Sequence, residues 1–151
     1  MSTEVHVMDA AASMALWPDI EPFVAAALAR DPWESTTTQE VAEQLASDDA
    51  LLLVAVDQGD ILGAAVVQLF NLRTGKVVYV LTTAGDKLDL WVAPMVERLL
   101  DLAVIYGADH VTMTGRPGWA RALRKYGFKT DQIQMKLEVA NVRRQEQAKA
   151  I

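Results

Sequence analysis

Residues 51–83, LLLVAVDQGDILGAAVVQLFNLRTGKVVYVLTT, contain three apolar and β-branched runs separated by two turn-like segments. The runs 51–56 and 61–70 flank the turn DQGD, in which glycine allows the backbone of a tight β-hairpin. A second turn-like segment, NLRTG, precedes the run KVVYVLTT at 76–83. This stretch therefore predicts three consecutive antiparallel strands at the centre of a sheet.

The residues before this stretch predict a strand and a helix. Residues 5–7 alternate as Val-His-Val, which indicates a short strand with His6 facing solvent. Apolar residues then recur at helical spacing over 16–28. Since proline is tolerated only near the start of a helix, Pro18 and Pro22 predict that this helix begins close to Leu16.

A second helix is expected directly before the three strands. Thr37 and Glu40 form a capping-box pattern, in which each side chain accepts a hydrogen bond from a free N–H of the first helical turn. The helix that they open is expected to run to about Ala46.

The residues after the central stretch predict two further helices and two further strands. Apolar residues follow a 3.6-residue period over 92–104, and Gly107 is suited to end this longest helix. The run HVTMT at 110–114 follows it and is expected to lie parallel to the third central strand. A short helix over 119–125 and a closing strand QIQMKLEV at 132–139 complete the domain 1–139, leaving a polar tail at 140–151 that is helix-compatible.

Composition limits the class of protein. A chain of 151 residues with 52% hydrophobic and 23% charged residues fits one domain with a sizeable core. The net charge of −6 disfavours a nucleic-acid partner, and the absence of cysteine excludes disulfides and zinc–thiolate sites. No secretory signal or membrane-spanning run is recognised, so a soluble protein without a membrane partner, cytoplasmic on synthesis, is expected.

Other chemistries find no support in the sequence. His6 and His110 lack the carboxylate spacing of a protein metal site. The serines stand in no G-x-S-x-G setting, so a hydrolase is not indicated.

The order of elements, together with WARALRKYGF at 119–128, resembles the GNAT acetyltransferase fold over roughly residues 4–139. In that family an apolar short helix precedes a Gly-Phe pair, matched here by Gly127 and Phe128. The resemblance implies an α/β (α+β) fold with a mixed, mostly antiparallel sheet of about six strands and four helices. It also implies a V-like parallel opening between the fourth and fifth strands.

The stretch TTAGDKLDLWVAP at 82–94 departs from the family pattern Q/R-x-x-G-x-G/A, which holds the pyrophosphate of acetyl-coenzyme A. Gly85 is its only glycine, and Asp86 and Asp89 place carboxylates where phosphate oxygens would lie. The simpler interpretation is that Asp89 caps the long helix. Lys87 and the hydroxyls of Thr82 and Thr83 leave weak phosphate binding as an alternative.

Two further departures concern the short helix. Leu123 stands where many family members place a tyrosine general acid, and Arg116 stands where many place an asparagine. The pair Thr82–Thr83, the long helix without glycines and the segment GRPGW at 115–119 resemble degenerate acetyltransferase-like proteins of tailed bacteriophages.

The leading hypothesis is a noncatalytic protein of this fold that needs no cofactor and contacts other proteins, in a phage virion or in a second copy of itself. Large side chains are its candidate contact residues, although the simpler interpretation of the aromatic ones is that they cover the core. These candidates are Trp33, Arg116, Trp119, Arg121, Arg143 and Arg144.

The alternative is an N-acetyltransferase that uses acetyl-coenzyme A to acetylate an amine. Under this alternative, the residues from the third central strand to the long helix bind the cofactor, and Tyr79 and Tyr126 are the catalytic candidates. The cofactor-binding candidates are Leu81, Thr82, Thr83, Gly85 and Lys87.

Overall fold

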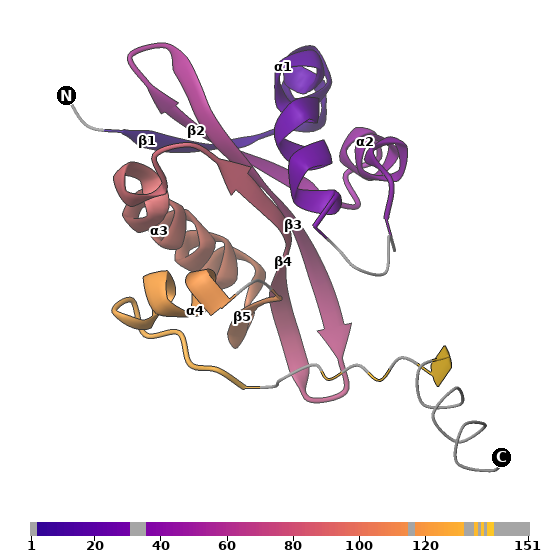
Figure 1. Cartoon of the computed structure of the whole chain (residues 1–151), viewed down its shortest axis with the longest axis vertical. Coiled ribbons are helices and arrows are strands. Elements are labelled where there is room, and N and C mark those ends of the chain that lie inside the picture. Colours follow the sequence, from indigo (N-terminus) through magenta and orange to yellow (C-terminus); the bar gives the residue numbers. More distant parts are fainter. Residues whose placement is uncertain are drawn as a thin grey trace, which may run out of the picture.

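The computed structural model describes residues 3–30, 36–114, 117–131, 135, 137 and 139–140. Within them the chain forms five strands and four helices (Figure 1). In chain order these are β1 (Glu4–Met8), α1 (Ala10–Leu28), α2 (Thr38–Ala46), β2 (Leu51–Asp57), β3 (Asp60–Leu72), β4 (Gly75–Gly85), α3 (Leu88–Tyr106), β5 (His110–Met113) and α4 (Pro117–Arg124).

One sheet of strand order β1-β2-β3-β4-β5 organises the domain. Neighbouring strands are antiparallel except β4 and β5, which are parallel and joined through α3. This confirms the three central antiparallel strands and the parallel crossover. Helices α1 and α2 lie on one face of the sheet, and α3 and α4 lie on the other (Figure 1).

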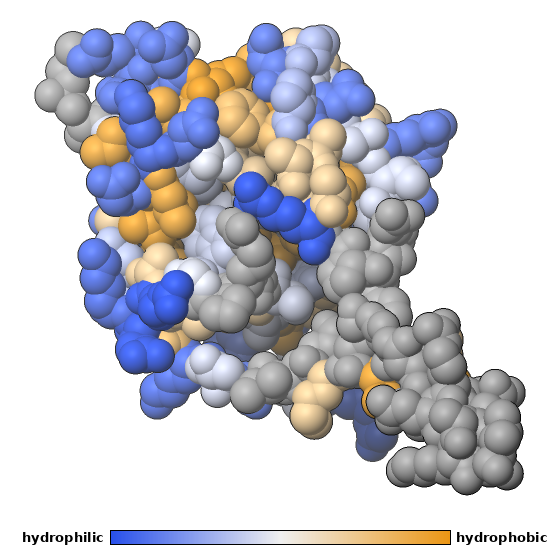
Figure 2. Space-filling model, in the orientation of Figure 1, coloured by the Kyte–Doolittle hydropathy of each residue, from blue (hydrophilic) through white to orange (hydrophobic). Residues whose placement is uncertain are grey.

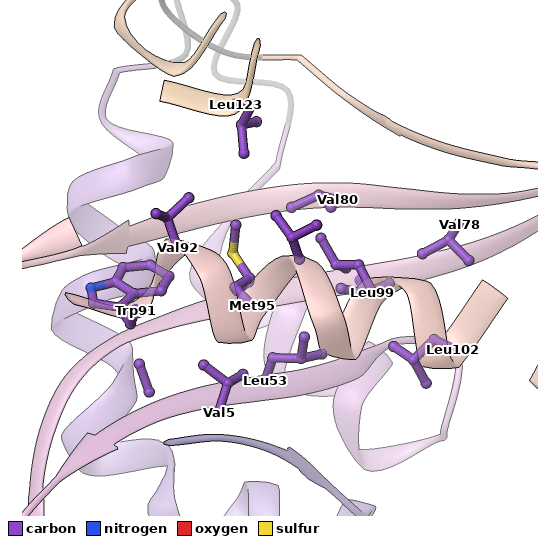
Figure 3. Packing of buried hydrophobic residues seen from close by; sticks show 14 of the residues in the cluster. Val5, Leu53, Val78, Val80, Trp91, Val92, Met95, Leu99, Leu102 and Leu123 are labelled. Carbon is purple, nitrogen blue, oxygen red and sulfur yellow. The ribbon is translucent and has the colours of Figure 1, made fainter. Parts of the chain in front are cut away.

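The apolar residues divide into two cores because successive side chains of a strand point to opposite faces. On the α3 face, Trp91, Met95 and Leu99 pack against Leu53 and residues of β4 (Figure 3). On the other face, side chains of α1 and α2 pack against even-numbered residues of β2 and β3. Burial of each large side chain contributes roughly 1.5–3 kcal/mol to the stability of the folded chain, so both cores stabilise the sheet.

The start of α1 differs from the sequence expectation. The helix begins at Ala10, and the Asp9 carboxylate accepts a hydrogen bond of 2.7 Å from the Ala12 N–H. Pro18 and Pro22 therefore lie inside the helix and not near its start. The expected start near Leu16 was wrong. The N-cap and the alanine-rich first turn stabilise the helix by more than it loses from the two backbone N–H groups that the prolines lack. The α2 start is confirmed, since the Thr37 hydroxyl accepts from the Glu40 N–H.

Helix α3 begins after Lys87, which has a left-handed backbone and makes no side-chain cap. Asp89 lies inside the first turn, so the expectation that it caps the helix was wrong. Gly107 ends the helix in the left-handed conformation, as expected.

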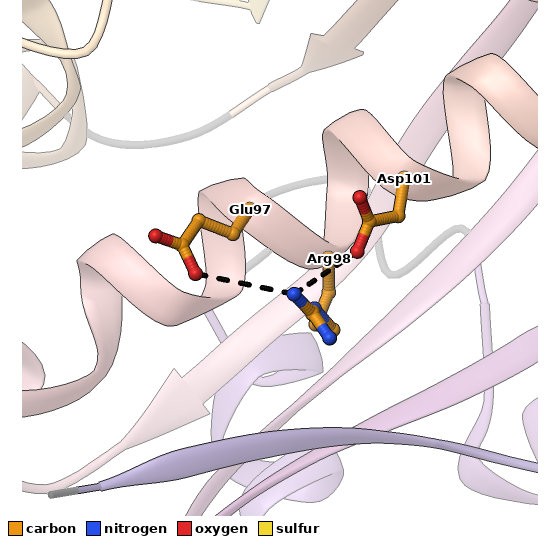
Figure 4. Close-up of polar contacts among 3 residues, drawn as sticks. All are labelled: Glu97, Arg98 and Asp101. Carbon is orange, nitrogen blue, oxygen red and sulfur yellow. Dashed lines mark ion pairs between the residues drawn. The ribbon is translucent and has the colours of Figure 1, made fainter.

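On the outer surface of α3, Arg98 pairs with Asp101 at 3.0 Å and lies 3.9 Å from Glu97 (Figure 4). Such exposed pairs contribute little to stability.

The expected closing strand falls mostly outside the described residues. Among residues 132–139, only Met135, Leu137 and Val139 are described, and neither Met135 nor Leu137 belongs to a strand. The described sheet thus has five strands where about six were expected. Of the expected tail 140–151, only Ala140 is described. Within the described ranges, no helix has the length and hydropathy needed to cross a membrane.

Candidate functional site

Strand β4 is paired on both sides only along its first half. Its parallel pairing with β5 runs from Val77 opposite His110 to Val80 opposite Met113. Its antiparallel pairing with β3 continues to Gly85. Between Val80 and Thr82 the register shifts, so Leu81 is an extra residue in β4 at the point where the two parallel strands separate. The backbone from Leu81 onward therefore has an edge that no described strand occupies.

Thr82 and Thr83 lie on this edge and point to opposite faces of the sheet. Thr82 pairs with Val66, which belongs to the core under α1 and α2, whereas Thr83 pairs with Ala65, which belongs to the core under α3. The Thr83 Oγ1 atom is buried and has no hydrogen-bond partner among the described residues. A buried hydroxyl without a partner is unfavourable, so this atom is suited to a bound polar group.

The connection from β4 to α3 is held tightly by backbone contacts. The Asp86 N–H donates to the Leu62 carbonyl at 2.8 Å, and the Asp86 carbonyl accepts from the Trp91 indole N–H at 2.8 Å. A Cβ on Gly63 would lie 2.7 Å from both the Ala84 carbonyl oxygen and the Trp91 ring. The close approach of β3, β4 and Trp91 therefore sets the direction in which α3 leaves the sheet.

The charges at the start of α3 only partly favour the binding of an anion such as phosphate. The free N–H groups of the first turn and the ammonium of Lys87 are positive. Asp86 and Asp89 are exposed at the same place and carry negative charge. The Asp86 N–H is already bonded to β3, so fewer donors remain than a glycine-rich phosphate loop offers.

Tyr79 lies on the paired half of β4, two residues before the separation. It pairs with Gln68, whose side-chain N–H donates to Gln44 of α2 at 2.6 Å. The Phe70 and Tyr79 ring centroids are 5.8 Å apart. Tyr79 is half-buried on the α1 and α2 side of the sheet, so it and the Thr83 hydroxyl lie on opposite faces.

Helix α4 contributes packing to the core beneath α3. Leu123 is 2% exposed and points into that core (Figure 3). Trp119 and Tyr126 are partly buried and pack against the same core. The Lys125 Nζ lies 5.3 Å from the centre of the Tyr126 ring, and Arg121 is exposed. The Leu123 position itself therefore carries a buried apolar side chain, which cannot donate a proton.

Four of the residues proposed for partner contact, Trp33, Arg116, Arg143 and Arg144, lie outside the described residues. In the part of the chain that is described, no three His, Asp or Glu residues gather as a metal site would require. Sequence reasoning missed Gly63 and Trp91 as parts of this region. Their apolar or small character fits an ordinary strand and helix, so no local signal could have singled them out.

Comparisons with known proteins identify the architecture. No family model matches the chain, and no curated protein matches it. Among solved structures it is similar to an aminoglycoside acetyltransferase from an uncultured soil metagenomic sample, at 20% identity and a TM-score of 0.68 over 92% of this chain and 99% of that one. A predicted acetyltransferase from Clostridium acetobutylicum, solved with acetyl-CoA, matches at 14% identity and a TM-score of 0.66 over 92% and 97% of the two chains.

A third solved structure extends this likeness. The glucosamine-6-phosphate N-acetyltransferase of Arabidopsis thaliana matches at 16% identity and a TM-score of 0.63 over 92% of this chain and 99% of that one. Because the sequence identities are this low, the comparisons show the shared fold only. The activity has to be inferred from the residues of the site. The chain therefore has the GNAT acetyltransferase fold, with the parallel opening between β4 and β5 that the sequence resemblance implied.

Proposed function

We propose that this protein is an N-acetyltransferase that transfers the acetyl group of acetyl-coenzyme A to an amine. The observation that carries the proposal is the open edge of β4 from Leu81 onward, where β5 has separated and a buried Thr83 hydroxyl has no hydrogen-bond partner among the described residues. The fold of the acetyltransferases to which the chain is similar supports it.

The open edge fits the pantetheine arm of the cofactor. An unpaired strand edge presents alternating N–H and C=O groups, which can bond the amides of an extended ligand as they would a neighbouring strand. The backbone of Leu81, Thr82 and Thr83 would provide these groups, and the ligand would give the Thr83 hydroxyl the hydrogen-bond partner that no described residue supplies. This part of the site therefore suits the ligand.

The start of α3 fits the pyrophosphate of the cofactor less well than the open edge fits the pantetheine arm. Lys87 and the helix N-terminus attract phosphate, whereas the carboxylates of Asp86 and Asp89 repel it. Gly85 contributes a close approach of backbones here, since a Cβ on it would meet Gly63 and the Leu62 carbonyl. We expect the pantetheine contacts, and not the phosphate contacts, to dominate affinity.

When bound, acetyl-coenzyme A supplies a thioester carbonyl that is open to attack by an amine. The amine loses a proton as the amide bond forms and the carbon–sulfur bond breaks, and the phenol of Tyr79 on β4 could relay that proton through water toward the departing sulfur. Because Leu123 is buried and apolar, the chain offers no acid there for the departing sulfur. We therefore expect turnover that depends on water and is slow relative to related enzymes.

The first experiment is thermal unfolding with and without acetyl-coenzyme A, followed by calorimetric titration. At about 100 times the dissociation constant, linkage predicts roughly 2.7 kcal/mol of stabilisation, which is a melting shift of several degrees. Thr83→Val should reduce this shift, whereas the matched change Thr74→Val in the exposed β3–β4 turn should leave it intact. No shift and no heat at millimolar ligand would refute the proposal.

Turnover can be measured directly because the chain contains no cysteine. A thiol reagent therefore reports only the coenzyme A released as amines of different classes are added. Release that depends on both amine and protein, and that falls in Tyr79→Phe, supports the transferase. Binding without release for any amine would leave a domain that binds the ligand and transfers nothing.

A second candidate function is a noncatalytic domain that contacts other proteins, including those of a phage virion. The buried Leu123 and the carboxylates of Asp86 and Asp89 favour it, because each departs from what acetyl transfer needs. Recovery of the chain in purified phage particles, together with the absence of acetyl-coenzyme A binding, would establish this function over the first.

A further inference from the structure

The candidate site is matched unequally to the two ends of coenzyme A. The open edge of β4 offers a pantetheine arm backbone groups that no described strand bonds, and the buried Thr83 hydroxyl. At the start of α3, Asp86 and Asp89 are exposed, and the Asp86 N–H is already bonded to the Leu62 carbonyl. A donor that keeps the pantetheine arm and lacks the pyrophosphate and ribose phosphate avoids these carboxylates. The site therefore suits a pantetheine thioester without a nucleotide.

Helix α4 borders the same opening on the side of β5. The parallel pairing of β4 with β5 ends at Val80 opposite Met113, and α4 begins soon after, at Pro117. In Figure 1 this helix lies beside α3 and β5. Leu123 holds it there, because its side chain packs into the core beneath α3 (Figure 3). The outer surface of α4 therefore lies next to the place where β4 and β5 separate.

The outer surface of α4 is basic. Arg121 and Arg124 are exposed in its last turn, and exposed Lys125 follows directly. Lys129 lies a few residues further along, and residues 117–130 contain no acidic residue. No ion pair within the described part of the chain engages these four side chains. Figure 2 shows a hydrophilic surface over α4 at the lower left of the molecule. This surface favours an acidic partner.

The charge of the opposite face directs an acidic partner toward α4. Arg30 is the only basic residue among residues 9–50, which include α1 and α2. Acidic side chains of this layer, among them Asp19, Glu43 and Asp49, are exposed. An acidic protein is repelled from the α1 and α2 layer and attracted by α4, so electrostatic steering brings it to the side of the opening.

We propose that the donor is an acidic carrier protein that bears its acetyl group on a pantetheine arm, and that Arg121, Arg124 and Lys125 bind the surface of this carrier. The inference rests on the proposed function, since the arm occupies the same open edge of β4, where acetyl-coenzyme A binds more weakly. The amine nitrogen attacks the thioester carbonyl, the carbon–nitrogen bond forms and the carbon–sulfur bond breaks. The amine proton passes to the sulfur, so the products are an acetylated amine and a carrier with a free thiol.

Calorimetric titration tests the inference without a known acceptor. The titrants are acetyl-coenzyme A, acetyl-pantetheine, and a purified acyl carrier protein with and without its acetyl-loaded arm. Because arm and surface contacts on one molecule reinforce each other, we expect the loaded carrier to bind at least about tenfold more tightly than acetyl-coenzyme A. Acetyl-pantetheine should bind within a few-fold of acetyl-coenzyme A, since the nucleotide contributes little at the start of α3.

Reversing the charge of α4 separates the surface contact from the arm contact. Arg121→Glu combined with Arg124→Glu should weaken binding of the loaded carrier at least about tenfold and leave acetyl-coenzyme A binding unchanged. Arg73→Glu is the matched control, because Arg73 is exposed in the distant β3–β4 turn. The loss of affinity should shrink as salt rises. Thermal unfolding without ligand checks that each variant is folded.

The possible outcomes separate this inference from the proposed function. Acetyl-coenzyme A that binds as tightly as the loaded carrier, or equal affinity for the carrier with and without its arm, overturns the carrier and leaves the transferase standing. Equal weakening of carrier and acetyl-coenzyme A by the α4 variant also overturns it, since the basic side chains would then hold the nucleotide phosphates. If no ligand with a pantetheine arm binds, the proposed function and this inference fail together.

Discussion

The two halves of β4 differ in the strands with which they are paired. From Gly75 to Val80 the strand is paired with β3 on one side, and with β5 over Val77–Val80 on the other, and its inward side chains are buried. From Leu81 to Gly85, β3 is its only partner among the described strands, and Trp91 and Gly63 fix its course. Under the proposed function the open half binds the ligand, because a strand edge that no described strand occupies leaves backbone N–H and C=O groups free to bond it.

The largest expected effect on stability comes from removing Trp91, which packs against Leu81–Gly85, the open half of β4. Trp91→Ala leaves a cavity at a residue that is 1% exposed and should lower the free energy of unfolding by about 3–5 kcal/mol. Trp91→Phe keeps most of the volume and loses the hydrogen bond to the Asp86 carbonyl, so it should cost less. Chemical denaturation measures both. Equal losses would mean that the hydrogen bond, and not the packing, supports this half.

The next effect tests the close approach of β3 to β4. Gly63→Ala places a Cβ against the Ala84 carbonyl and the Trp91 ring, and we expect a loss of about 1–3 kcal/mol from the strain. Gly118→Ala is the control, because a Cβ there meets no atom within 4 Å. Calorimetric melting compares the two. A Gly63→Ala protein as stable as the control would show that the strands can separate freely.

The buried hydroxyl of the open half should show opposite effects on stability and on binding. Thr83→Val removes a polar atom without a described partner, so the free protein should become more stable by about 1 kcal/mol. The same change should weaken acetyl-coenzyme A binding. Unfolding and titration are measured on one preparation. A loss of stability in the free protein would mean that the hydroxyl has an internal partner.

The smallest effect concerns the charges at the start of α3. Asp89→Asn removes one carboxylate from the first turn and should raise the affinity for acetyl-coenzyme A by a few-fold, an effect of less than about 1 kcal/mol. Stability should fall slightly, since an acidic residue favours a helix start. Titration at low and high salt checks the electrostatic origin, because the gain should shrink as salt rises. Asp101→Asn, at the far end of α3, should leave affinity unchanged.

Local chemistry made much of the fold predictable. The central strands followed from β-branched runs and turn glycines, and α2 followed from the Thr37–Glu40 capping pattern, because each depends on neighbours in sequence. The start of α1 was misjudged because the prolines were weighed without the Asp9 cap. For the site, Leu81, Thr82, Thr83 and Lys87 were named from the resemblance alone, and the structure places them at the open edge and the helix start.

The sequence by itself determined the central strands, the approximate positions of the four helices, which faces are apolar, and that Leu123 cannot donate a proton. Only the tertiary structure decided where β5 separates from β4, that the Asp86 N–H is already bonded to β3, and that the Thr83 hydroxyl is buried without a described partner. The physical reason is that periodicity and capping act between residues close in the chain. Strand separation and unpaired polar groups depend on partners distant in sequence, whose positions follow from the packing of the whole domain.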